Sequence, residues 1–272
     1  MNISLRHSSR HSFISRGFDR ALFFLLVFVL MGFCLGRLSH GLPAHAQAVV
    51  PFTMVTESLS YSQARKAKLF LQETKARRSD GATVQINNSI SHHPKLNVRN
   101  ISLPDGRAFT VFDLIHAVVK WPPSPKSIAY QKERLSNSPP DCLLGVGEYV
   151  AGHGTLMGEN VVVLKMLPKG SSGITWWRSP KLGCEALQSR MTQVQMDGSF
   201  RLASETKLLS LRIGAPDSTL FEVPASYRSL SPSQAQKELA AKLGLRWTKE
   251  MARRAQEQDA VYYGQSPLSH PR

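Results

Sequence analysis

The sequence lacks the short motifs that mark many enzyme active sites. It contains no Gly-x-Ser-x-Gly elbow, no His-Glu-x-x-His zinc signature, no phosphate-binding loop and no dinucleotide fingerprint. Nor do its histidines beyond residue 46 form the close set with carboxylates that binds a metal; they are His92, His93, His116, His153 and His270. We therefore expect no catalytic residue, no metal site and no cofactor.

Cysteine is also scarce, with three in the chain: Cys34, Cys142 and Cys184. So few cysteines, without a Cys-x-x-Cys pair, do not make a structural zinc site. In an oxidising compartment Cys142 and Cys184 are a disulfide candidate, because an even pair of cysteines in an exported chain favours a bridge. The alternative is that both are small buried apolar residues on separate strands.

Long hydrophobic runs are absent except for one, Ala21–Gly36, which holds sixteen residues without a charge. Arginines precede it, and two overlapping small-x-small sites follow it, ending at Ala46 and Ala48. A basic flank, an apolar run and such a site are the three parts of a secretory signal peptide. We expect residues 1–46 to be removed on export, leaving no transmembrane span. An uncleaved inner-membrane anchor is the alternative, although the run is shorter than the roughly 20 residues that cross a bilayer.

Acidic residues are few: 19 Asp and Glu stand against 34 Lys and Arg, a formal net charge of +15. Without residues 1–46 the counts are 18 and 29, a net charge of +11. Such an excess favours anionic surfaces, and export favours those of the cell envelope over nucleic acid. The densest basic cluster, our candidate basic surface, consists of Arg65, Lys66, Lys68, Lys75, Arg77 and Arg78. These charges would also keep a sheet edge from pairing with a neighbouring chain, so both roles stay open.

Beyond residue 46 the pattern is that of strands and turns. Short runs of β-branched and aromatic residues recur between turn signals such as Ser79-Asp80-Gly81 and Asp197-Gly198. Strands joined by turns too short for a crossover helix predict an antiparallel sheet, here over 47–230. The segment Phe109–Trp121 fits strand or helix by its spacing, and its β-branched residues favour strand. A proline-rich stretch at 122–141 is expected to be a long loop.

The last segment changes character. Ser231, followed by Pro232 and Gln234, predicts a capped helix start. Apolar residues then recur every four positions up to Met251, which predicts a helical segment over 231–258 that Gly244 can divide in two. Residues 259–272 are expected to form a disordered tail.

Two stretches, Trp177–Cys184 and Pro216–Tyr227, resemble a group of uncharacterised exported bacterial proteins. The shared layout is Trp-x-x-Pro-x-Leu-Gly-Cys, followed by Pro-Asp-x-x-Leu-Phe-x-Val-Pro-x-x-Tyr. This group is similar in plan to the lipoprotein-carrier (LolA-like) superfamily, in which a curved antiparallel sheet wraps helices and holds acyl chains. The resemblance implies a mainly β fold, with a curved, half-barrel-like antiparallel sheet, a C-terminal helix and an envelope location.

The resemblance has departures and supplies no catalytic residues. Lys181 stands where the group often has an acid, and Ser226 replaces a usual glycine. Physically, the Leu-Phe-x-Val-Pro ending predicts a last strand that stops at Pro224, with Leu220 and Phe221 in the core.

Three functions follow from these observations. The favoured one is an exported, non-catalytic envelope protein that binds or carries a lipid or other amphiphile. The second is a structural or interaction protein that docks on envelope components through a basic surface. The third is an envelope hydrolase, which would need an acid and base pair in a cleft.

Overall fold

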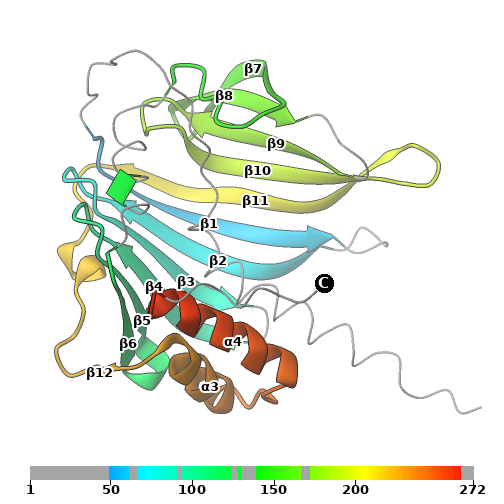
Figure 1. Ribbon diagram of the computed structural model, residues 1–272. Helices are drawn as coiled ribbons and strands as arrows, with labels where there is room; N and C mark the ends of the chain where they lie inside the picture. Colours follow the sequence, from blue (N-terminus) through cyan, green and yellow to red (C-terminus); the bar gives the residue numbers. More distant parts are fainter. Residues whose placement is uncertain are drawn as a thin grey trace, which may run out of the picture. The chain divides into compact units, whose positions relative to one another are not determined.

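A computed structural model describes residues 49–61, 67–90, 93–123, 128–129, 139–166 and 172–264 of this protein. The expected signal peptide at 1–46, most of the loop expected at 122–141 and residues 265–272 of the expected tail lie outside these ranges. The described part is mainly β, as the sequence predicts, and its strands form one large, open, curved sheet (Figure 1).

Two consecutive meanders build this sheet. The first consists of β1 (Phe52–Tyr61), β2 (Ala67–Arg77), β3 (Thr83–Ile90), β4 (His93–Ser102), β5 (Ala108–Phe112) and β6 (Ala117–Trp121). The second consists of β7 (Glu148–Leu156), β8 (Glu159–Met166), β9 (Ser172–Ser179), β10 (Glu185–Val194) and β11 (Phe200–Ile213). β11 pairs antiparallel with β1, and a two-residue strand, β12 (Arg228–Ser229), adds in parallel to β6. The strand order is therefore β12-β6-β5-β4-β3-β2-β1-β11-β10-β9-β8-β7.

Local sequence signals explain the turns between strands. Gly81 and Gly198 have φ angles of +90° and +76°, which glycine adopts without the Cβ clash that other residues suffer. Both turns predicted from the sequence are present. The ambiguous segment Phe109–Trp121 forms strands, as favoured, but a 3-10 turn, η1 (Asp113–Ile115), divides it into β5 and β6.

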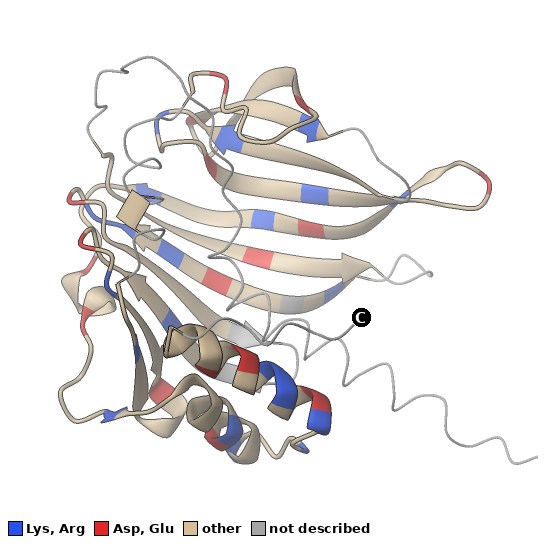
Figure 2. Cartoon of the chain, in the orientation of Figure 1, with Lys and Arg blue, Asp and Glu red and all other residues tan. Residues whose placement is uncertain are grey.

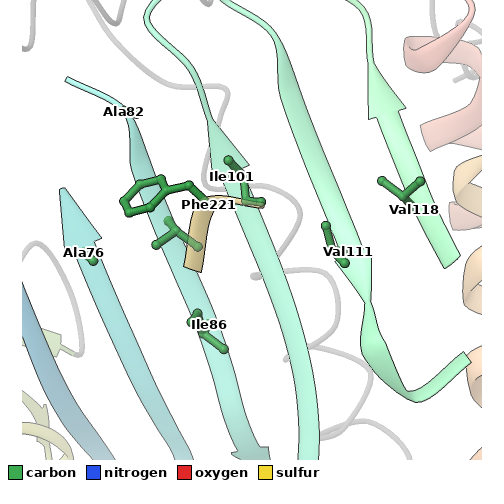
Figure 3. Packing of buried hydrophobic residues seen from close by; sticks show 8 residues of the cluster. Ala76, Ala82, Ile86, Ile101, Val111, Val118 and Phe221 are labelled. Carbon is green, nitrogen blue, oxygen red and sulfur yellow. The ribbon is translucent and has the colours of Figure 1, made fainter. Parts of the chain in front are cut away.

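The prediction of a last strand ending at Pro224 is wrong. Residues Ser218–Phe221 form a short 3-10 helix, η2, because the Asp217 side chain accepts a hydrogen bond from the Thr219 N–H and starts a helical turn. Phe221 is nevertheless buried, as expected, and it packs on one face of β2–β6. Figure 3 shows it among Ala82, Ile86 and Ile101 of the same cluster.

Two helices follow, α3 (Pro232–Lys242) and α4 (Lys249–Tyr262). The predicted capping box at Ser231 is present, with Gln234 as its partner. Gly244, at φ +68°, lies between the helices, so the segment divides where the sequence allowed. The helical segment ends later than the expected 258, because α4 continues to Tyr262.

The helices lie on the opposite face of the sheet from η2. α3 lies against β6 and η1, and the ring of Tyr262 at the end of α4 is 5.7 Å from that of Trp121, edge to face. We call the side of β2–β6 that carries Trp121 the helix face, and the side that carries Phe221 the η2 face. No helix among the described residues is both long enough and apolar enough to span a membrane.

Candidate binding site

A band of polar side chains crosses the helix face. Residues paired directly between antiparallel strands point to the same face, and Gln85 pairs with both Lys75 and Asn100. Asn100 in turn pairs with Thr110, and Asn87 pairs with Glu73. We call this set the polar row; it comprises Glu73, Lys75, Gln85, Asn87, Asn100, Thr110 and Trp121.

Part of the polar row forms a hydrogen-bonded chain. The Trp121 Nε1–H donates to Thr110 Oγ1 over 2.9 Å, and the Thr110 hydroxyl donates to Asn100 Oδ1 over 3.0 Å. Gln85 Nε2 donates to Glu73 Oε2 over 2.6 Å. These bonds set the orientation of the two carboxamides, because Asn100 Oδ1 already accepts one hydrogen bond and Gln85 Nε2 already donates one.

Two carboxamides of the row keep buried atoms without a partner among the described residues. Asn87 is 1% exposed, and neither its Oδ1 nor its Nδ2 makes a hydrogen bond within the described ranges; Asn100 is 8% exposed, and its Nδ2 is likewise unpaired there. Most buried polar atoms in native proteins are hydrogen-bonded, and each unmade bond costs about 1–3 kcal/mol. The helix face thus presents one acceptor and two donor groups that a ligand could satisfy.

The charged members of the row lie at its β2 end. Burial raises the pKa of the Glu73 carboxyl, although the hydrogen bond from Gln85 and the charge of Lys75 act in the other direction. Lys75 Nζ lies 2.5 Å from Glu185 Oε1 of β10. Glu73 is therefore a half-buried carboxyl of this face whose pKa lies above its usual value, with its burial as the main cause.

Apolar side chains flank the polar row on both sides of the helix face. Toward β11, Met54 pairs with Leu211, and Thr56 pairs with Leu208. Toward β6, the row is bounded by buried side chains on the same face: Val98, Phe112 and Val119. The helix face therefore carries a polar band between two apolar ones, and Met54 and Leu208 pack in one cluster with Leu182 and Leu187.

Replacement of Glu73 by glutamine is expected to stabilise the protein at neutral pH. Because the folded pKa is raised, the folded state binds the proton more tightly than the unfolded chain does. Wild-type stability therefore falls as the pH rises from the unfolded value of 4.5 through the folded pKa. Glu73→Gln removes this fall. The free energy of unfolding in urea, measured at several values between about pH 4.5 and pH 8, tests this expectation, with Glu222→Gln at an exposed position as control. Parallel plots of this free energy against pH for wild type and Glu73→Gln would contradict it.

The described residues of the candidate basic surface lie in different surroundings. Arg77 is 3% exposed, and its guanidinium donates to the carbonyl oxygens of Val50 and Leu182. Lys75 belongs to the polar row, and Arg78 pairs with Asp80. Lys68 is exposed on β2, whereas Arg65 and Lys66 lie outside the described residues. Arg77 and Lys75 therefore point to the helix face of the sheet through strand alternation and pair there. Basic and acidic residues are interspersed over the strands (Figure 2).

The disulfide candidates meet beside β7. Cys142 and Cys184 are joined in the structure, with their Cα atoms 5.2 Å apart. Next to them Arg178 donates to both carboxylate oxygens of Glu148, at 2.8 Å each, and to the Cys142 carbonyl oxygen at 2.9 Å. Burial alone would raise the pKa of Glu148, but these bonds and those from the Leu144 and Gly145 N–H groups lower it.

The histidines that the structure describes do not gather around a metal site. Within the described ranges, no group of three His, Cys, Asp or Glu side chains is arranged to hold a metal ion. His153 is an exposed residue of β7, and the His116 ring stacks at a tilt on Tyr227, 5.5 Å away. His92 and His270 lie outside the described residues.

The sequence held a signal for the polar row that our sequence reasoning missed. Asparagine is depleted in strands, yet Asn87 and Asn100 stand in the middle of strand-forming runs, TVQINNSI and HPKLNVRNIS. Amides at inward positions of a sheet indicate either a buried hydrogen-bond network or a ligand.

Comparisons with known proteins concern the fold. No family model and no curated protein matches this sequence. An uncharacterized conserved protein from Thermus thermophilus is 9% identical over 68% of this chain and 91% of its own, with a TM-score of 0.42. The Pseudomonas aeruginosa MucA/MucB complex is 15% identical over 70% of this chain and 61% of its own, with a TM-score of 0.38. A LolA superfamily protein from Nitrosomonas europaea is 6% identical over 63% of this chain and 90% of its own, with a TM-score of 0.28.

The last of these belongs to the LolA superfamily, to which the group that shares the two sequence motifs is similar in plan. At such identities, and with TM-scores below 0.5, the similarities assign no function to this chain.

Proposed function

We propose that this protein binds an amphiphile on its helix face and acts as a non-catalytic carrier in the cell envelope. The ligand carries at least one acyl chain together with amide, ester or hydroxyl groups. The chain would lie along the apolar bands, and the polar groups would bond to the polar row. The N-terminal signal features at 1–46 support the envelope location.

Asn87 is the observation that carries the proposal. A buried carboxamide with neither atom bonded destabilises the folded protein, and it is explained if a ligand supplies the missing partners. An amide or ester of a lipid offers a carbonyl oxygen to Nδ2, and an amide N–H or a hydroxyl bonds to Oδ1. Apolar flanks alone would bind any hydrocarbon, so the polar row is what would select such ligands.

The test uses N-palmitoylglycine and palmitic acid as competitors of dansylaminoundecanoic acid, a fluorescent fatty acid. Asn87→Leu is expected to weaken N-palmitoylglycine binding about tenfold, since two hydrogen bonds are lost, and to change palmitic acid binding little. In the absence of ligand, the free energy of unfolding of Asn87→Leu is expected to be about 1 kcal/mol higher than that of the wild type, because the unpaired polar atoms are gone.

Asn88→Leu is the matched control. Asn88 is the next residue of β3, points to the other face and donates to Thr74 Oγ1 over 2.8 Å. It is expected to leave both affinities unchanged. Equal effects of the two variants on binding, or absence of binding to the wild type, would refute the site.

Salt separates this proposal from docking through basic charges. Burial of acyl chains is not screened, whereas attraction between exposed charges is largely lost at about 0.5 M salt. Binding is therefore expected to persist at high salt. A signal that disappears there would favour the surface-docking alternative.

A further inference from the structure

An apolar loop is exposed next to the last strand of the sheet. Leu143, Leu144 and Val146 are 36%, 60% and 84% exposed. The exposed apolar surface continues along the start of β7 with Tyr149 and Val150, at 41% and 38%. We call residues 142–147 together with β7 the β7 edge. This surface is distinct from the polar row and does not depend on it.

The loop is held rigidly despite its exposure. The Cys142–Cys184 disulfide anchors its start, and the buried Arg178–Glu148 pair anchors its end. Glu148 also accepts hydrogen bonds from the backbone of Leu144 at 2.9 Å and Gly145 at 3.0 Å. A loop ordered before binding loses little conformational entropy on association, so these apolar side chains are prepared for a contact.

β7 offers a free backbone edge beside that loop. It ends the strand order, and no described strand lies beyond it (Figure 1). Its hairpin with β8 closes through Met157 and Gly158, both at positive φ, so Leu156 and Glu159 form the closing hydrogen-bonded pair. Alternation along an antiparallel pair then turns the backbone N–H and C=O of His153 and Thr155 outward.

The edge lacks the residues that usually block strand addition. β7 contains neither lysine nor proline. At Gly152 an added Cβ would meet no atom within 4 Å, and at Gly154 only Val161 at 3.8 Å. A small bulge at Ala151 precedes this stretch, but the pairing beyond it is regular up to Leu156.

Charge decides which strand fits. The net charge of +11 expected without residues 1–46 opposes close pairing of two copies of the chain. Lys165 is exposed, pairs across the strands with Tyr149, and has no ion-pair partner among the described side chains. On a strand added to β7, the residue opposite Tyr149 would lie about two strand spacings, roughly 10 Å, from Lys165. A glutamate at that position, extended toward Lys165, would place its carboxylate near the ammonium group.

We infer that the β7 edge binds an extended segment of a partner protein, rich in β-branched residues and carrying glutamate, which adds as a strand to β7. Its backbone bonds to that of His153 and Thr155. Its apolar side chains pack on the loop at Leu144 and Val146, and its glutamate, on the face of Tyr149, is directed toward Lys165. This is strand addition, in which main-chain bonds give affinity and neighbouring side chains give selectivity.

The experiment measures fluorescence anisotropy of a fluorescein-labelled peptide, Thr-Val-Glu-Val-Thr-Val-Glu-Val-Thr-Val, with the purified protein, and of the same peptide with lysine for glutamate. The wild type is expected to bind the glutamate peptide about tenfold more tightly than the lysine peptide, and Lys165→Glu to reverse that order. His153→Pro removes an outward N–H without touching the β8 ladder, and is expected to weaken both about tenfold. His153→Ser, which keeps the N–H, is expected to bind as wild type.

Circular dichroism of each variant is the check that it folds. Leu144→Ser tests the loop independently and is expected to lower the affinity for both peptides several-fold. Equal binding by His153→Pro and His153→Ser, or no binding to the wild type, would overturn the inference. Concentration-dependent dimerisation that His153→Pro abolishes would assign the edge to a second copy instead. Sedimentation with anionic lipid vesicles that Leu144→Ser abolishes, without peptide binding, would assign the loop to a membrane.

Discussion

Arg178→Met is expected to lower the free energy of unfolding by about 3–5 kcal/mol. Arg178 and Glu148 are 10% and 5% exposed and joined by two hydrogen bonds of 2.8 Å. Methionine would leave the Glu148 carboxylate buried without its counter-charge and the Cys142 carbonyl oxygen without its donor. It would also remove the guanidinium from the face of the Trp176 ring, 4.8 Å away.

Urea unfolding measures the loss, and Arg107→Met is the matched control. Arg107 pairs with Asp105 at 2.7 Å, but both side chains are more than half exposed. Exposed pairs contribute about 0–1 kcal/mol, so the control is expected to unfold almost as the wild type does. If Arg178→Met also stays within about 1 kcal/mol of the wild type, the pair does not anchor the loop.

Acid should act on the same pair. Since the folded pKa of Glu148 is lowered from 4.5, its contribution is fully present above that value and is lost as the pH falls through the folded pKa. Glu148→Gln in an Arg178→Met background is expected to recover part of the stability, because the uncompensated charge is gone.

Loss of the disulfide is the second large effect expected. Cys142 and Cys184 are separated by 42 positions, and opening a closed loop of that size costs about 4 kcal/mol in the chain-entropy model. Against a usual domain stability of about 5–15 kcal/mol, this is a large share. The double variant Cys142→Ser/Cys184→Ser is expected to melt at a clearly lower temperature and to be insensitive to reducing agent.

Thiol labelling of unfolded, unreduced protein gives an independent readout. We expect label at Cys34 alone where residues 1–46 are retained, and none where they have been removed. Label at Cys142 and Cys184 would show two buried thiols in place of a bridge. Because Arg178 and the disulfide hold the same loop, the effect of removing both is expected to be smaller than the sum of the separate effects.

The sequence by itself determined the features that depend on neighbouring residues. The turns at Gly81 and Gly198 and the capped start of α3 at Ser231 require only backbone freedom or one nearby side chain. A run of strands with short connections likewise implies antiparallel pairing whatever the rest of the chain does. The fold class could therefore be predicted, while the last strand could not, because Asp217 turns its start into η2 and Phe221 finds its place on the sheet.

Only the tertiary structure decided which side chains meet. Arg77 was expected on a basic surface but is buried, because alternation along β2 turns it toward the loop that carries Leu182. Asn87 and Asn100 share one face with Glu73 and Thr110 only through the register of β2–β5. Register sets the face on which every residue of a strand points, and it depends on long-range pairing that no local pattern encodes.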